Sequence, residues 1–238
     1  MAGSSLPPIT RVSRANTHRL IPSRYPAVGI LDEVASPEDL ELIWELEGWT
    51  NDRIEGELGI IRTIPRDEWV TGQPLASVIM AAFCHPHLEG SRFNDGTRGA
   101  WYCAFSLKTA HAEAIYHRTL ELQEVGVFDT FLEMREYRAG FSTDFHDIRK
   151  GGPRFARCYS PTNYATAQKL GGILVRNNSN GIVYRSVREA TGTCLVCFRP
   201  RLVTDLRMGA HFEYRWSGGR TPEIRVSTGE KIPREVAG

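Results

Sequence analysis

The spacing of apolar and polar residues along the chain predicts a mixture of helices and strands. Apolar positions that recur every three or four residues predict helices over residues 37–48, 74–84, 107–123 and 161–170. Short apolar or alternating runs predict strands over residues 57–64, 100–105, 131–138, 180–186 and 192–198. Because the strands cluster late in the chain, we expect an α+β fold, with a mixed or antiparallel sheet and helices packed on one side.

The two ends of the chain lack such a pattern. Residues 1–16 contain Ser, Pro and Arg without periodicity, and residues 217–238 are rich in Gly, Pro and charge, so both are expected to be loose. The segment 18–26 is typical of neither a helix nor a clean strand. No linker of Pro, Gly and Ser separates two domains, so residues 1–238 are expected to form a single domain.

The helix predicted over residues 107–123 has the clearest boundaries. Ser106 can cap its start, and Gly126 lies just beyond its end. At 100° per residue, one side of this helix collects small apolar residues together with Glu113 and His117. A carboxylate that faces inward is costly unless it is paired or functional. Two interpretations stay open: an ion pair with His117 or an arginine that only holds the fold, and a functional site.

Composition narrows the class of protein. The 238 residues are 41% hydrophobic and 24% charged, which is ordinary for a soluble globular protein and excludes a chain disordered throughout. Lys and Arg number 29 against 28 Asp and Glu, and this net charge of +1 argues against a strongly basic nucleic-acid binder. Nearly all the cations are Arg, which suits bidentate binding of phosphate or carboxylate, although a biased genome explains the same excess.

The sequence indicates neither a membrane span nor secretion. No stretch reaches the ~18 consecutive apolar residues of a membrane helix. Residues 1–14 lack the apolar core of a signal peptide. The five cysteines are few and odd in number, which predicts reduced thiols in a cytoplasmic protein.

Motifs of several common chemistries are missing from the sequence. It has no P-loop and no Gly-rich dinucleotide motif, and Ser186 lacks the elbow motif of serine hydrolases. Cys194 and Cys197 lie in a predicted strand, where positions three apart face opposite sides, so we expect two buried thiols. His111 and Glu113 point about 200° apart on their helix and cannot converge on a zinc ion. No metal site is predicted.

Three blocks of the chain, in this order, carry a family resemblance. The first is the Arg-led HRLIPSR at residues 18–24. The second is GSRFNDGTRGAWYCAFSLKTAHAEAIYH at residues 90–117, which joins a turn containing Gly and Arg to a Tyr strand and a Glu helix. The third is NGIVYRSVREATGTCLVCFRP at residues 180–200. Over about residues 19–200 the chain thus resembles the RES domain family, which is named for a dispersed Arg, Glu and Ser.

The resemblance implies a fold related to ADP-ribosyltransferases and chemistry on NAD. Such proteins are typically toxins of toxin–antitoxin pairs, which degrade NAD or transfer its ADP-ribose until a helix-turn-helix antitoxin of the Xre type covers the site. It therefore implies NAD as substrate, no metal, such an antitoxin as partner, and a homodimer within the complex as an option. A helical N-terminal elaboration over about residues 30–88 and a flexible tail over 217–238 exceed a minimal domain of this kind.

The resemblance also assigns roles to individual residues. Glu113 matches the family's helix Glu, which would stabilise the cationic ribose formed when the bond to nicotinamide breaks. Arg92 and, less closely, Arg19 match arginines that would hold the pyrophosphate. Tyr102 matches the strand Tyr, which could stack on nicotinamide or orient the ribose. Ser186 matches the family Ser, which could donate to a phosphate or to the carboxamide.

The chain departs from the family pattern at two neighbouring positions. Ser91 stands where Gly is usual, and Phe93 stands where Trp is usual. The side chain of Ser91 narrows the approach of a phosphate to the backbone. His117, one turn after Glu113, is a candidate for orienting its carboxylate.

Three functions remain open at this level. The first is a toxin that degrades NAD by hydrolysis or phosphorolysis, and the second is ADP-ribosyl transfer to a protein. The third is a module that binds NAD without catalysis, against which the intact set of Arg92, Tyr102, Glu113 and Ser186 argues. Direct binding of nucleic acid is the weakest option, because the charge is balanced and no recognition motif occurs.

Overall fold

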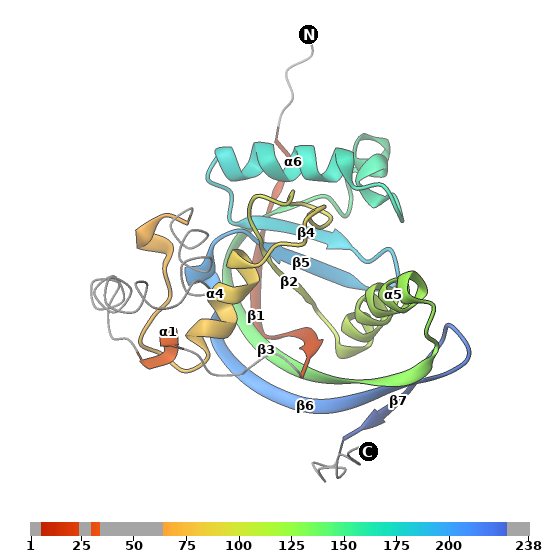
Figure 1. Ribbon diagram of the computed structural model, residues 1–238. Helices are drawn as coiled ribbons and strands as arrows, with labels where there is room; N and C mark the ends of the chain where they lie inside the picture. Colours follow the sequence, from red (N-terminus) through yellow and green to blue (C-terminus); the bar gives the residue numbers. More distant parts are fainter. Residues whose placement is uncertain (1–5, 24–29, 34–63, 228–238) are drawn as a thin grey trace.

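The computed structural model describes residues 6–23, 30–33 and 64–227 (Figure 1). Its strands are β1 (Ile9–Pro22), β2 (Trp101–Ala104), β3 (Asp129–Asp147), β4 (Gly181–Arg185), β5 (Thr193–Cys197), β6 (Thr204–Ser217) and β7 (Glu223–Val226). Its α-helices are α1 (Ile30–Glu33), α4 (Ala76–Cys84), α5 (Leu107–Val125) and α6 (Ala165–Arg176). Its 3-10 helices are η1 (Arg66–Glu68), η2 (Gly152–Tyr159) and η3 (Pro200–Leu202). This combination confirms the α+β class.

The seven strands form one mixed sheet in the order β1-β2-β5-β4-β3-β6-β7. Because β1 pairs with β3 as well as with β2, the series β1-β2-β5-β4-β3 closes on itself. Only β3 and β4 are parallel, at His146 opposite Ile182 and Asp147 opposite Val183, while the other described pairs are antiparallel. Figure 1 shows the short strands β2, β5 and β4 above the long, bent β3 and β6. The main core lies between these two groups.

The helices cover different faces of this sheet, which corrects the expectation that they pack on one side. Along β5, Leu195 and Cys197 face the interior and share a core with α4 and Trp101. Cys194 and Val196 face the other way and share a core with α6. Since both faces of β5 are buried, each requires its own helical cover. The same alternation confirms that the two cysteines face opposite sides, and all five cysteines of the chain are free and buried.

β1 is the strand that the sequence pattern missed most clearly. Only Val12 and Thr17 in this strand are fully buried, so it has no alternating apolar signal. Twelve of its residues nevertheless lie in register with β3. Backbone pairing holds this strand more than side-chain burial does. The expectations of a loose segment over 1–16 and an irregular one over 18–26 are therefore wrong for residues 9–22.

Helix α6 begins and ends later than the pattern predicts. The helix starts at Ala165 rather than at residue 161, and just before it the Oδ1 of Asn163 accepts a hydrogen bond from the N–H of Ala165 at 3.0 Å, as in an Asx turn. It continues through Gly171 and Gly172, because the bare backbone of Gly171 packs against the carbonyl of Phe93. A pair of glycines that resembles a stop signal in the sequence is a packing site in the structure.

Most of the other predicted elements are found. The segments predicted over 74–84, 100–105, 107–123, 180–186 and 192–198 are confirmed as α4, β2, α5, β4 and β5. β3 extends well beyond the predicted 131–138, and β6 was not predicted. β7 pairs with β6 inside the tail that was expected to fray. The helix predicted over 37–48, and the strand predicted over 57–64 apart from its last residue, lie outside the described residues.

The contact of Gly171 predicts a pair of substitutions with opposite effects. Gly171→Ala is expected to lower the free energy of unfolding by about 1–3 kcal/mol, because its methyl group would lie 1.8 Å from the carbonyl oxygen of Phe93. The matched control is Gly172→Ala, whose methyl group would meet only Arg176, at 3.4 Å. That variant is expected to gain up to about 1 kcal/mol, because Ala favours helix more than Gly does. Urea unfolding measures both, and an equal effect of the two would contradict this packing.

Candidate active site

The helix α5 forms between the boundaries that its sequence predicts. The Oγ of Ser106 accepts a hydrogen bond from the N–H of Thr109 at 3.2 Å, which caps the start of the helix. Gly126 ends it in the left-handed conformation, with a φ of 71°. Glu113 lies in the second turn of this helix and reaches toward β4 and β5. The helix thus presents a carboxylate to the ends of two strands.

The Glu113 carboxylate is fixed through one of its two oxygens. Its Oε1 accepts a hydrogen bond from the Oγ of Ser186 at 2.6 Å and contacts the Sγ of Cys194 at 3.7 Å. In the part of the chain that the structure describes, its Oε2 has no hydrogen-bond partner. The side chain is half-buried, so this second oxygen remains available. Glu113 is therefore oriented, with one oxygen uncommitted.

Ser186 is placed to orient this carboxylate. The serine is buried and follows the last residue of β4. Its Oγ donates to Glu113 and accepts hydrogen bonds from the N–H groups of Arg188, at 3.0 Å, and Glu189, at 2.9 Å. A hydroxyl has one hydrogen and two acceptor lone pairs, so this set of bonds saturates it. While these bonds hold, Ser186 has no hydrogen to give to a phosphate or a carboxamide.

His117 lies apart from the Glu113 carboxylate. His117 is exposed to solvent, and among the described residues no hydrogen bond joins it to Glu113. Its ring makes an edge contact with Tyr116, with centroids 5.3 Å apart. The described residues include no ion pair between Glu113 and His117 or an arginine. The hydrogen bond that orients the Glu113 carboxylate comes from Ser186 instead.

Tyr102 uses its hydroxyl to hold the turn that follows residue 90. The hydroxyl donates to Asn94 Oδ1 at 2.7 Å and accepts from the N–H of Phe93 at 2.9 Å. Burial raises the pKa of this phenol, so it stays protonated at neutral pH. The side chain projects from β2 on the same face as Ala104, as the alternation of the strand predicts. Tyr102 thereby connects β2 to the turn that carries Arg92.

Arg92 is buried and connects that turn to the end of η2. Its Nη1 donates to the carbonyls of Cys158, at 3.0 Å, and Ser160, at 2.8 Å. Its guanidinium lies over the ring of Tyr164, with Cζ 4.6 Å from the ring centroid. No carboxylate forms an ion pair with Arg92 within the described ranges. The charge is held by carbonyls and a π face, which leaves it uncompensated by an anion.

Tyr184 joins the residues that the sequence singled out. Its ring packs edge-on against Phe93, with centroids 4.8 Å apart. Burial raises the pKa of its phenol well above the usual value, and the charges of Glu113 and Arg92 act on it as well. Tyr184 thus connects the two pairs of predicted residues. Its ring contacts Phe93, which follows Arg92 and donates to Tyr102, and it lies two residues before the Ser186 that holds Glu113. Nothing in the sequence marked Tyr184 except its place in the block that contains Ser186.

Arg19 belongs to the opposite face of β2. Its Nη1 donates to the backbone carbonyl of Tyr102 at 3.1 Å, but its guanidinium lies over Trp101, with Cζ 4.8 Å from the ring centroid. Trp101 faces the interior between the two strand groups. Burial lowers the pKa of Arg19 to about 10, so the guanidinium remains charged at neutral pH. The structure brings four of the five predicted residues together and sets Arg19 behind the strand.

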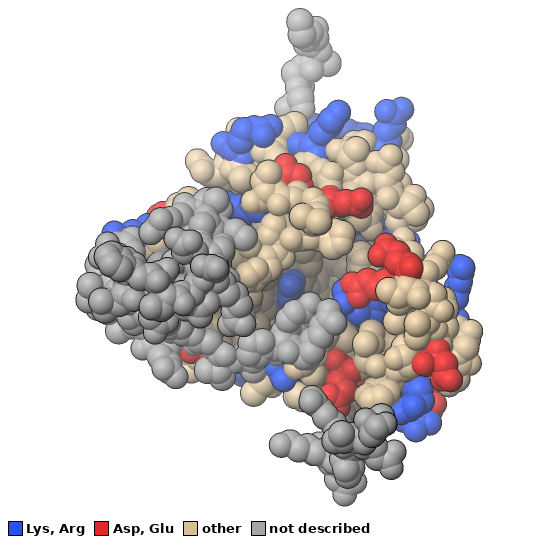
Figure 2. Space-filling model, in the orientation of Figure 1, with Lys and Arg blue, Asp and Glu red and all other residues tan. Residues whose placement is uncertain are grey.

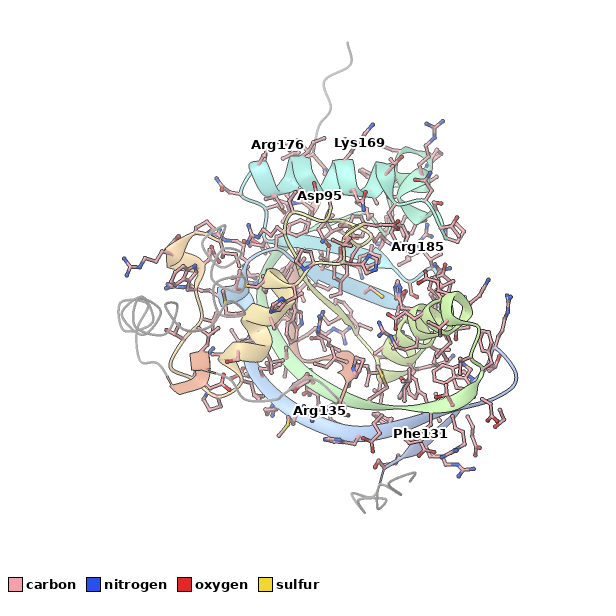
Figure 3. The ribbon with its side chains drawn as sticks, in the orientation of Figure 1. Asp95, Phe131, Arg135, Lys169, Arg176 and Arg185 are labelled. Atoms are coloured by element: carbon pink, nitrogen blue, oxygen red, sulfur yellow. The ribbon has the colours of Figure 1, made fainter. Side chains whose placement is uncertain are left out.

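The face of the molecule between α4, α5 and α6 is hollowed. Figure 2 shows a hollow in the middle of the displayed face, with Lys and Arg atoms in its depth. Figure 3 labels Arg185, which directly precedes Ser186, between the level of α6 and that of α5. Across the described ranges, no group of three His, Cys, Asp or Glu side chains could hold a metal ion. No helix in those ranges has the length and apolar composition to cross a membrane.

Comparison with known proteins identifies the family. The model of the RES domain matches residues 62–217. The chain belongs to the RES domain family. The matched part of this RES domain protein contains Arg92, Tyr102, Glu113 and Ser186, whereas Arg19 precedes it.

Two further similarities are found for this RES domain protein. The uncharacterized protein y4oC of Sinorhizobium fredii is 29% identical over 227 residues, which cover 93% of this chain and 92% of that protein. The crystal structure of the M. tuberculosis MbcT–MbcA toxin–antitoxin complex contains a chain that aligns with a TM-score of 0.45 at 10% identity. That alignment covers 86% of this chain and 87% of the other.

Proposed function

We propose that this RES domain protein cleaves the bond between nicotinamide and ribose in NAD, and that it arrests growth unless a partner protein neutralises it. The Glu113 carboxylate carries the proposal, because one oxygen is fixed by Ser186 and Cys194 while the other is uncommitted. Family membership supports the same reading, since the match contains every residue of this cluster. The relation to ADP-ribosyltransferases remains part of the proposal.

The chemistry follows from the charge that develops on the sugar. As nicotinamide leaves, the ribose acquires oxocarbenium character, as in glycoside cleavage. A carboxylate held beside C1 stabilises that cation, and the uncommitted Oε2 of Glu113 is the oxygen available for it. Ser186 prevents the carboxylate from rotating away, so its role in the proposal is positioning. The bond from C1 to nicotinamide breaks, nicotinamide leaves as the neutral base, and the nucleophile then forms its bond to C1.

The remaining residues would bind the dinucleotide. Arg92 has no carboxylate partner within the described ranges and keeps N–H groups for a phosphate oxygen beyond those on the two carbonyls. Tyr102 presents a ring whose hydroxyl is already engaged, so stacking on nicotinamide is the role left to it. Arg19 lies on the other face of β2. Its guanidinium would contact the pyrophosphate only if the dinucleotide extended around that strand.

The partner and the acceptor belong to the same proposal. Water, phosphate or a protein side chain could accept the ADP-ribose, because the acceptor is whatever reaches C1 of the ribose. A toxin requires an inactive state, and we propose a cytoplasmic antitoxin of the Xre helix-turn-helix type, with a homodimer within the complex as an option. Binding of nucleic acid by this chain alone is not part of the proposal.

An assay of NAD consumption tests this function. The purified chain is incubated with NAD, with and without phosphate, and the products are separated by chromatography. Free ADP-ribose indicates hydrolysis, a phosphorylated ADP-ribose indicates phosphorolysis, and a labelled protein after addition of lysate and labelled NAD indicates transfer. If NAD persists in all three conditions while calorimetry shows that it binds, the protein is a binding module and the proposed function is wrong.

A further inference from the structure

Arg188 crosses from the β4–β5 connection to two other elements beside Glu113. Its backbone N–H donates to the Ser186 hydroxyl that holds Glu113. Its Nη2 donates to the carbonyl of Pro161, in the connection between η2 and α6. Its guanidinium lies over the ring of Tyr116 on α5, with Cζ 3.2 Å from the ring centroid. Arg188 therefore spans three elements that surround the proposed catalytic carboxylate.

The guanidinium of Arg188 is held in place before any ligand arrives. Tyr116 follows Glu113 by three residues, so both lie on neighbouring turns of the same side of α5. The hydroxyl of Tyr116 also donates to the Pro161 carbonyl, at 3.3 Å. On the other side of the same loop, Glu189 pairs with Lys108 at 3.2 Å. Because these contacts already hold the Arg188 side chain and its loop, binding an anion costs little further conformational entropy.

One donor of Arg188 is left without an acceptor. Its Nε is buried and has no hydrogen-bond partner among the residues that the structure describes. No carboxylate forms an ion pair with this guanidinium in the part of the chain that the structure describes. A buried N–H of a charged group costs free energy when it is unpaired. A ligand oxygen with negative charge would satisfy this donor and compensate the charge.

The segment of the chain that leads to Arg188 carries an excess of positive charge. Residues 148–188 contain no Asp or Glu, and their eight cations are Arg149, Lys150, Arg154, Arg157, Lys169, Arg176, Arg185 and Arg188. Figure 2 shows blue atoms along the edge of the molecule formed by α6, and Figure 3 labels Lys169 and Arg176 there. An anion that enters here meets a positive potential.

We propose that Arg188 is a phosphate-binding residue of this site, with Nε–H and the free N–H groups of its guanidinium directed at phosphate oxygens beside Glu113. This inference rests on the proposed function, which supplies the ligand. The phosphate has two possible sources: the pyrophosphate of the dinucleotide, and inorganic phosphate that accepts the ADP-ribose. In both cases the forked donors of arginine match the oxygens of phosphate.

Binding titrations of three ligands test the proposal. NAD, inorganic phosphate and nicotinamide riboside, which lacks phosphate, are titrated calorimetrically into the Glu113→Gln protein, which is expected to consume NAD about 10²–10³-fold more slowly. Adding Arg188→Ala is expected to weaken at least one phosphate-bearing ligand about tenfold or more and to leave the riboside unchanged. Loss of NAD affinity identifies the pyrophosphate as the source, and loss of inorganic phosphate affinity identifies the acceptor.

Two further variants separate binding from folding. Arg185→Ala is the matched control, because Arg185 is exposed, lies in the same acid-free segment and packs its guanidinium on Tyr159. Arg188→Lys keeps the charge and the reach but loses the Nε–H and the fork, so it is expected to keep the thermal midpoint and still lose most of the affinity.

The outcomes are separable from those of the proposed function. Equal affinities of Arg188→Ala and Arg185→Ala for both phosphate-bearing ligands would overturn the assignment of Arg188. If the protein neither binds nor consumes NAD, the proposed function is wrong. The titration with inorganic phosphate alone then decides whether Arg188 binds phosphate. Phosphate binding that depends on Arg188 would then support the assignment, and absence of phosphate binding would refute it.

Discussion

Glu113→Gln is expected to slow NAD turnover by about 10²–10³-fold while the protein keeps its fold. The amide has the size of the carboxylate and can still accept the hydrogen bond from Ser186, but it has no negative charge for the developing cation. The affinity for NAD is expected to change little, because the charge acts mainly in the transition state. Initial rates of nicotinamide release at saturating NAD measure the effect.

A matched control comes from the same helix. Glu124 is exposed in the last turn of α5, so Glu124→Gln changes the net charge equally without touching the site. Its turnover is expected to stay within a factor of two of the unmodified protein. A Glu113→Gln protein with full turnover would remove the carboxylate from the mechanism. Equal losses in both variants would point to helix stability instead of chemistry.

Glu136→Ala is expected to cost about 3 kcal/mol of the free energy of unfolding, the largest effect on stability that the structure predicts. The Glu136 carboxylate is fully buried in β3 and accepts hydrogen bonds from His18 at 2.6 Å and from Arg138 at 3.0 Å through both oxygens. Its Oε2 also accepts from the N–H of Ala210, at 3.0 Å. Removal of the anion leaves these donors unpaired beneath α5. Urea unfolding at pH 7 measures the loss.

The control for this position lies on the same strand. Glu133 is exposed on β3, so Glu133→Ala removes a carboxylate from the surface and is expected to change stability by less than about 0.5 kcal/mol. If Glu136→Ala were as mild as Glu133→Ala, the buried network would not contribute to the stability of the fold.

The same carboxylate predicts a dependence of stability on pH. Burial alone would raise the pKa of Glu136, but hydrogen bonds from Arg138, His18 and Ala210 outweigh it and lower the pKa to about 2. The folded pKa is below the unfolded one, so the stabilisation is complete above about pH 4.5 and is lost as the pH falls toward 2. The difference in unfolding free energy between the unmodified protein and Glu136→Gln should therefore shrink over this window. A constant difference would contradict the shift.

This buried network also bears on the site, because it lies beneath the helix that carries Glu113. On α5, His111 Nδ1 hydrogen-bonds the hydroxyl of Tyr214 at 2.5 Å, and its ring packs edge-on against Phe212, with centroids 4.6 Å apart. His111 and Glu113 thus face opposite sides of α5, as their spacing predicts. One side anchors the helix to β6, and the other presents the carboxylate.

Local signals were sufficient where the decisive interaction is local. Ser106 and Gly126 predicted the boundaries of α5, because capping depends on residues within a turn of the helix end. The same holds for β2, where alternation placed Tyr102 and Trp101 on opposite faces. The order of the three blocks also indicated the family that comparison then showed.

Contacts between distant segments decided what the pattern could not. β1 is polar and is held by backbone pairing with β3, which lies more than a hundred residues away in the sequence. Its own residues therefore show no hydrophobic periodicity that would predict a strand. Gly171 lies within α6, where its bare backbone packs against the carbonyl of Phe93. The low helix propensity of glycine does not reveal this contact. The network of Glu136 was likewise invisible, because burial of that carboxylate depends on His18 and Ala210 from other strands.

The sequence by itself determined the residue types of the candidate site, the boundaries of the helix that carries Glu113, and the resemblance to the RES domain family. Only the tertiary structure decided that Ser186 saturates its hydroxyl on Glu113 and backbone N–H groups, that Arg19 lies behind β2, and that Arg188 spans three elements. The physical reason is that composition and spacing specify which groups exist and which way a helix or strand points them. Hydrogen-bond partners depend on which distant segments pack together, and those distances exist only in the folded chain.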